Sequence, residues 1–119
     1  MNNTELGAFG ESMAERYLIN KGLRIIDKNV RFKKWEADII AEDGDKLVVI
    51  EVKTRQTAEI GEPWRAVTKS KQRQIIQVAN HYVCLHQIDK DTRFDIVSIV
   101  HNSYRTNIEH IEDAFYPLV

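Results

Sequence analysis

The chain has 119 residues, of which 43% are hydrophobic and 29% are charged, so its composition predicts one globular domain spanning residues 1–119. The 17 Lys and Arg residues nearly balance the 18 Asp and Glu residues, and the net charge of −1 excludes a globally basic nucleic-acid binder. The single cysteine, Cys84, excludes an internal disulfide and a multi-cysteine zinc site.

We expect a cytoplasmic protein with no membrane segment. Thr4, Glu5 and Glu11 occupy the positions where a signal peptide would need an apolar core. No apolar stretch is long enough to span a bilayer. A lone Cys84 is typical of a reducing compartment.

Residues 4–21 are predicted to form the first helix, with Thr4 as its N-cap. Its apolar residues at helical spacing are Leu6, Phe9, Met13 and Tyr17. Glu11 lies off this stripe, on the side of Ala14 and Leu18. It is therefore either an inward-reaching acid at the margin of the core or a surface glutamate.

Residues 23–32 are predicted to form the first strand, with a bulge or bend near Asp27. A small basic cluster follows, made of Arg31, Lys33 and Lys34. It either holds a nucleic-acid backbone or is a solvated strand edge.

Residues 36–53 contain two apolar runs on either side of Asp43-Gly44, which predicts a β-hairpin. A turn centred on that pair places Ala41 opposite Lys46, Asp38 opposite Val49, and Glu36 opposite Glu51. Because side chains alternate along a strand, one face would carry Glu36, Asp38, Glu51 and Lys53. The other face would carry Ala37, Ile39, Val48 and Ile50.

The run 47–50 is apolar at every position, which is typical of a central strand covered on both faces. Acids beside such a strand need a partner, and carboxylate oxygens are ligands that Mg²⁺ prefers. Lys53 could orient a metal-bound water or neutralise charge on a phosphate. The alternative is an exposed hairpin face with ordinary charged residues.

Residues 54–63 are predicted to form a loop, in which Arg55 is either a phosphate contact or a solvent-exposed side chain. The second helix is predicted at 64–88, and its apolar stripe is Val67, Ile75, Val78, Ala79, Tyr82 and Leu85. Lys71 falls on that stripe, so we expect its ammonium to point toward the carboxylates.

Lys71 is flanked by Lys69, Arg73 and Arg65 at the start of this helix, where phosphate is also favoured. This is the most basic patch of the chain, and the alternative is a generic amphipathic helix with solvated cations.

A strand is predicted at 93–101, a loop at 102–107, and a short edge strand at 108–111, with 114–116 capping the core. The predicted order is α-β-β-β-α-β-β, a mixed β-sheet flanked by helices, in the α/β class.

The order of Asp38, Glu51 and Lys53 resembles the PD-(D/E)xK motif of restriction-endonuclease-like nucleases. The patterns Glu-x-Asp-(apolar)₂-Ala and Glu-Val-Lys-Thr-Arg, with Gly-Glu-x-x-Ala-x-x-Tyr-Leu near the start, resemble the YraN-like family over residues 10–115. The chain is also similar to archaeal Holliday-junction resolvases, whose first-helix glutamate corresponds to Glu11. It departs from these patterns because no proline precedes Asp38, and Trp35 and Ala37 stand where Gly and Ile are usual.

The resemblance implies a restriction-endonuclease-like fold and a Mg²⁺- or Mn²⁺-dependent endonuclease acting on DNA, branched or single-stranded. The implied metal-binding set is Asp38, Glu51, the Val52 carbonyl and Glu11. Lys53 would position the attacking water, and Glu36 would be an additional ligand or a neighbour of Lys53. The implied nucleic-acid contacts are Arg55, Lys69, Lys71 and Arg73.

A resolvase-like role would need a homodimer, because two symmetric cuts require two sites. The rival interpretation is a catalytically silent nucleic-acid-binding or assembly module with the same fold. A third is a structural domain with no nucleic-acid partner.

Overall fold

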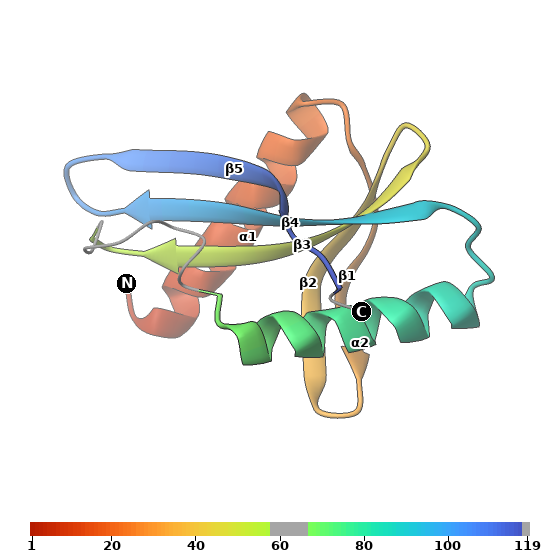
Figure 1. Ribbon diagram of the computed structural model, residues 1–119. Coiled ribbons are helices and arrows are strands. Elements are labelled where there is room, and N and C mark those ends of the chain that lie inside the picture. Colours follow the sequence, from red (N-terminus) through yellow and green to blue (C-terminus); the bar gives the residue numbers. More distant parts are fainter. Residues whose placement is uncertain (58–66, 118–119) are drawn as a thin grey trace.

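The computed structural model describes residues 1–57 and 67–117, which form two helices and a five-stranded sheet (Figure 1). The elements are α1 (Asn3–Asn20), β1 (Arg24–Phe32), β2 (Trp35–Asp43), β3 (Lys46–Arg55), α2 (Lys69–Leu85), β4 (Asp91–His101) and β5 (Thr106–Phe115). This order and the mixed sheet confirm the predicted α/β arrangement.

The strands lie in sequence order, β1-β2-β3-β4-β5, and β3 and β4 form the parallel pair while the other neighbours are antiparallel. A parallel pair needs a crossover, and α2 provides it. The helices cover opposite faces: α2 packs in the core cluster of Leu47 and Val49, and α1 in that of Val48 and Ile50. No helix in the described ranges could span a membrane.

Helix α1 begins one residue earlier than predicted, because Asn2 rather than Thr4 is its N-cap. Asn2 and Glu5 form a reciprocal capping box. The predicted apolar stripe was also shifted, since the buried positions are Leu6, Gly10, Ala14 and Leu18. Small residues on this face let the helix approach the sheet closely, and Glu11 therefore lies beside the buried face.

The predicted register of the β2–β3 hairpin was wrong by two residues. The turn residues are Gly44 and Asp45, so Asp43 pairs with Lys46 and Ala41 with Val48. Gly44 has a φ of +60°, which a two-residue hairpin turn requires at this position. An even shift leaves each β3 side chain on the same face.

The alternation of side chains between the two faces of the sheet is interrupted in β2 near Asp38. Ala37 packs in the core under α2, whereas Ile39, two residues later, packs under α1. The prediction that both share one face was therefore wrong. The β2–β3 pairing ends at Ile39–Ile50, so Asp38 is the first β2 residue beyond the ladder.

The remaining boundaries also differ from those predicted. Strand β3 continues through Arg55, which was predicted to be in a loop. Helix α2 begins at Lys69 with Thr68 as its N-cap, and it ends at Leu85, which is exposed rather than part of the core. Residues 58–66, which include most of the predicted loop and the predicted start of this helix at 64–66, lie outside the described residues.

Strand β5 is longer than predicted because its 10 residues, Thr106–Phe115, pair with β4 as far as Phe94–Phe115. The bulge predicted near Asp27 is confirmed, since the β1–β2 register shifts between Ile25 and Asp27.

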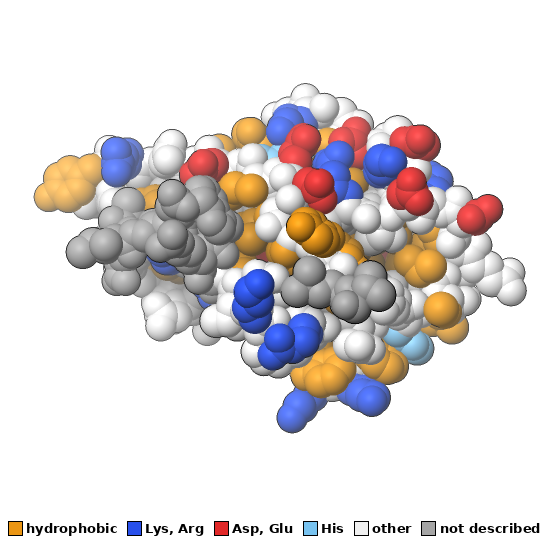
Figure 2. Space-filling model, in the orientation of Figure 1, with side chains coloured by type: hydrophobic (Ala, Val, Ile, Leu, Met, Phe, Trp, Pro, Cys, Tyr) orange, Lys and Arg blue, Asp and Glu red, His pale blue; other side chains and the backbone are white. Residues whose placement is uncertain are grey.

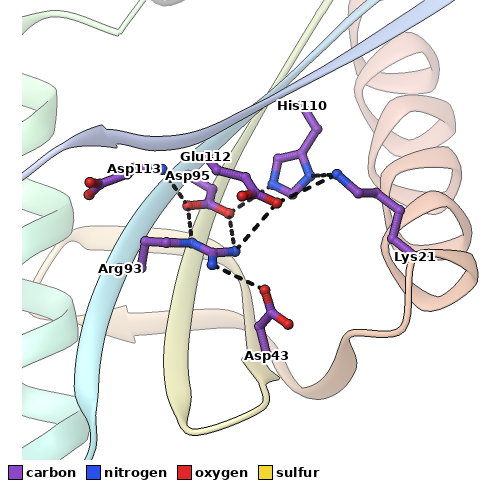
Figure 3. A network of polar contacts seen from close by, with 7 residues as sticks. All are labelled: Lys21, Asp43, Arg93, Asp95, His110, Glu112 and Asp113. Atoms are coloured by element: carbon purple, nitrogen blue, oxygen red, sulfur yellow. Dashed lines mark hydrogen bonds and ion pairs between the residues drawn. The ribbon is translucent and has the colours of Figure 1, made fainter.

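A polar network fixes the end of the sheet near the β2–β3 turn (Figure 3). The fully buried Asp95 accepts two hydrogen bonds of 2.9 Å from Arg93, and one of 3.0 Å from the Asp113 amide. His110 lies 2.8 Å from Asp95, and the Lys21 ammonium lies 2.8 Å from the other His110 ring nitrogen. Since an ammonium only donates, this His110 nitrogen accepts and the other donates to Asp95.

Burial alone would raise the pKa of Asp95, but hydrogen bonds from His110 and Arg93 outweigh it and leave that pKa below its ordinary value. Arg93 also reaches Asp43 at 3.0 Å, which ties the hairpin turn to β4. Asp95 therefore anchors the structure, in agreement with its position inside a strand.

Gly10 is where α1 touches β3. A Cβ atom at residue 10 would lie 2.8 Å from the Thr54 Cβ and overlap the Thr54 hydroxyl. We expect Gly10→Ala to lower the free energy of unfolding by about 1–3 kcal/mol, through overpacking. Gly7, on the same helix, has no neighbour there. Gly7→Ala should instead stabilise by up to about 1 kcal/mol. Urea unfolding of both variants measures the difference, and equal effects would contradict the close helix–sheet contact.

Candidate functional site

Asp38 and Glu51 meet where the β2–β3 ladder ends. The Asp38 carboxylate accepts a hydrogen bond of 2.8 Å from the Val52 amide, so it replaces the backbone partner that β2 no longer provides. Glu51, on the neighbouring strand, is only 6% exposed. The structure thus brings together the two acids that the sequence predicted to act as a pair.

The pair is electrostatically strained. Burial, and then hydrogen bonding with and repulsion by the Asp38 carboxylate, raise the pKa of Glu51 to about 9, against the lowering effect of the Lys71 ammonium. At neutral pH, Glu51 therefore holds a proton unless a further positive charge arrives.

Lys71 reaches this pair from α2. Its ammonium lies 3.5 Å from a Glu51 carboxylate oxygen, as expected for a lysine on the apolar stripe. The Lys71 side chain is 42% exposed, so the ammonium can move out to water when another cation takes its place.

Glu11 approaches Asp38 from α1. The two residues line one pocket of about 200 Å³. Partial burial raises the pKa of Glu11, and the negative charges of Asp38 and Glu36 raise it further, against the positive charge of Lys28. Glu11 is therefore an inward-reaching acid, and its pocket adjoins the Asp38–Glu51 pair.

Glu36 forms an ion pair of 3.1 Å with Arg31, its cross-strand neighbour on β1. The sequence left it as an additional ligand or a neighbour of Lys53, and the structure gives it Arg31 as its partner. Its charge nevertheless contributes to the field at Glu11.

Lys53 and Val52 follow Glu51 on β3. Lys53 is exposed, and by strand alternation it projects from the same face as Glu51. The N–H and C=O of one strand residue point to the same side, so the Val52 carbonyl points to the side on which its amide meets Asp38. Both groups therefore border the acid pair.

Arg55 ends β3 with a partly buried guanidinium. Its Nε atom is buried without a hydrogen-bond partner among the described residues. The other predicted contacts, Lys69 and Arg73, lie four residues apart on α2 and share one of its sides, whereas Lys71 turns toward Glu51.

Sequence reasoning missed Lys28 and Asn29, which line the pocket of Glu11 and Asp38. Asn29 has a φ of +51° and lies between the pairs Lys28–Ile39 and Val30–Ala37, hence across from Asp38. The β1–β2 turn that sets this register consists of Lys33 and Lys34, and no glycine marks it in the sequence.

The donor set fits a hard divalent cation. Within residues 1–57 and 67–117, no three His, Cys, Asp or Glu side chains lie close enough together to form a complete metal cluster. The Asp38 and Glu51 carboxyls, with Glu11 in the adjoining pocket, are nevertheless oxygen ligands whose repulsion a cation would relieve. Mg²⁺ usually takes only one or two carboxylates, with water and phosphate completing its shell.

The chain is similar to a group of proteins that share one family description. The profile described as "Uncharacterised protein family UPF0102" matches residues 10–99. The UPF0102 protein of Christiangramia forsetii is 44% identical over 114 residues, covering 96% of each chain. That of Phocaeicola vulgatus is 44% identical over 115 residues, covering 97% of this chain and 95% of the relative. These names state no activity, so the function is argued from the residues.

The raised pKa of Glu51 has a consequence for stability. The folded state binds this proton more tightly than the unfolded state, so the free energy of unfolding falls as pH rises from about 4.5 to about 9. We expect Glu51→Gln to flatten that decline in urea unfolding without divalent ions. The matched control is Glu109→Gln, at an exposed position of β5. An unchanged pH dependence in Glu51→Gln would contradict the buried, protonated carboxyl.

Proposed function

We propose that this chain, which belongs to the UPF0102 or YraN-like family, is a metal-dependent endonuclease acting on DNA. The observation that carries the proposal is the contact between Asp38 and the buried Glu51, with Lys53 two residues further along the same strand. Metal-dependent phosphodiester hydrolysis can use this combination, in which carboxylate oxygens bind a cation and a lysine offsets charge at the reacting phosphate.

Asp38 and Glu51 would hold Mg²⁺ or Mn²⁺, with the Val52 carbonyl as a further ligand and Glu11 in support. The ion would supply Lewis-acid stabilisation of the phosphate oxygens and a water of lowered pKa. Lys53 would orient that water and offset the negative charge that develops on the phosphate.

Occupation of the site by a cation would release the Glu51 proton and compete with the Lys71 ammonium. Because Lys71 is partly exposed, it can leave Glu51 without breaking the core and offer its charge to a nearby phosphate. The affinity for the metal should therefore rise with pH, as Glu51 loses its proton more easily.

Local asymmetry compensates for the net charge of −1. In the lower half of the face drawn in Figure 2, around α2 and the β1–β2 turn, Lys and Arg side chains are visible without acids, whereas in the upper half Lys and Arg side chains lie among the visible acids. Helix α2 carries Lys69, Lys71 and Arg73 in its first two turns, and its first turn holds no acid. Cations at a helix N-terminus oppose the helix dipole, and a bound phosphate would offset that cost.

We also infer a cytoplasmic location, where a lone Cys84 stays reduced.

Branched or single-stranded DNA is the proposed substrate, and cleavage of a symmetric junction would require a homodimer. The second candidate is a nucleic-acid-binding or assembly module without turnover, favoured by the Lys71 ammonium, which already lies 3.5 Å from Glu51, where a metal ion would have to bind.

The test is cleavage of labelled single-stranded, duplex and branched DNA across a titration of Mg²⁺ and Mn²⁺. We expect Asp38→Asn and Lys53→Met each to lower the cleavage rate about a hundredfold or more. Glu36→Gln is the matched control, because Glu36 pairs with Arg31, and it should keep most of the activity.

The same samples provide a readout that does not need turnover. Mn²⁺ should raise the melting temperature of the wild type more at pH 8.5 than at pH 6.5, and should not raise that of Asp38→Asn. The nuclease proposal would be refuted if the protein bound DNA but cleaved none of the DNA forms, and if Mn²⁺ did not raise its melting temperature. That result would support the silent module.

A further inference from the structure

A groove of about 530 Å³ lies between the first half of α2 and the end of β5. Lys69 and Arg73 line it from α2, and Phe115 and Tyr116 line it from the end of β5. Lys71, between the two cations in sequence, turns to Glu51 instead. The groove is therefore a separate surface, on another side of the helix from the acid pair.

The aromatic wall of the groove has one fixed and one exposed ring. Phe115 is buried and stacks on Phe94, with ring centroids 5.3 Å apart, so the backbone there is held in place. Tyr116 follows directly and is 66% exposed. A large exposed ring on a fixed backbone is available for stacking with a planar ligand.

The charge of the groove points to an anionic ligand. Among the described residues, neither Lys69 nor Arg73 has an acidic partner within ion-pair distance, whereas Lys46 and Lys90 do. Two cations beside an aromatic ring and the apolar Ile76 and Ala114 suit a ligand that is anionic and flat at once. The volume of the groove is also within the range of small-molecule sites.

We propose that this groove binds a nucleotide of a single-stranded DNA segment, with its base stacked on Tyr116 and its flanking phosphates on Lys69 and Arg73. This rests on the proposed function and names its substrate class. Because α2 is only about 10–12 Å across, a strand in the groove can continue to the acid pair within a few nucleotides. The groove would thus select DNA with a single-stranded segment beside the bond that is cut.

The test is binding of a fluorescein-labelled twelve-nucleotide oligothymidylate, measured by fluorescence anisotropy in EDTA, so that no cleavage is involved. We expect Tyr116→Ala to weaken binding about tenfold, and Tyr116→Phe to keep wild-type affinity because it keeps the ring. Lys69→Ala combined with Arg73→Ala should reduce the slope of log affinity against log salt by about 1.4, for two lost phosphate contacts.

The matched control is Arg24→Ala combined with Arg105→Ala, which removes the same charge from exposed positions that do not line the groove. Affinities of the groove variants equal to that control would overturn the proposal. So would a change in oligomeric state on size-exclusion chromatography in Tyr116→Ala alone, because a second copy would then occupy the groove.

Failure of this inference and failure of the nuclease can be told apart. Asp38→Asn should bind the oligonucleotide in EDTA like the wild type. Intact binding without metal-dependent cleavage would refute the nuclease alone, and intact cleavage without groove-dependent binding would refute the groove alone.

Discussion

The burial of the Glu51 carboxyl beside Asp38 is the constraint on which the site depends. A carboxyl that is 6% exposed and faces a second acid must keep its proton or meet a cation. The Lys71 ammonium, at 3.5 Å, partly meets that need. An ordinary core would place an aliphatic side chain at this position and gain stability, so an acid here indicates a demand other than folding.

The fold supplies this constraint by fixing one end of the sheet and opening the other. At the fixed end, Asp95 joins β4, β5 and the hairpin turn through Arg93 and His110 (Figure 3). At the open end, the β2 residues that precede Ile39 are not paired with β3, and α1 approaches the sheet closely at Gly10. Acids from one helix and two strands can therefore approach one another without weakening the core.

The order of elements and the acid pair could be predicted because their signals are local. The turn glycine and the run 47–50 defined the hairpin, and a lysine on an apolar stripe indicated the partner of Glu51. The facing of α1 was mispredicted because Gly10 and Ala14, which do not stand out as apolar, form its contact with the sheet. The Arg31–Glu36 ion pair and the position of Asn29 opposite Asp38 depend on the β1–β2 register. That register could not be predicted, because the turn between the two strands contains no typical turn residue.

By accepting a hydrogen bond from the Val52 amide, Asp38 also covers an unpaired edge of β3. Beyond Ile50, the described part of the chain pairs β3 with β4 alone, so the other side of the strand is an open edge. Open edges recruit strands from other molecules and promote aggregation, and side chains that occupy the edge amides prevent this. Asparagine at position 38 keeps an acceptor oxygen for that amide, whereas alanine would leave it bare. In an alanine variant, a loss of activity could therefore come from self-association or from the missing carboxylate. The same oxygen both protects the strand edge from aggregation and belongs to the candidate site.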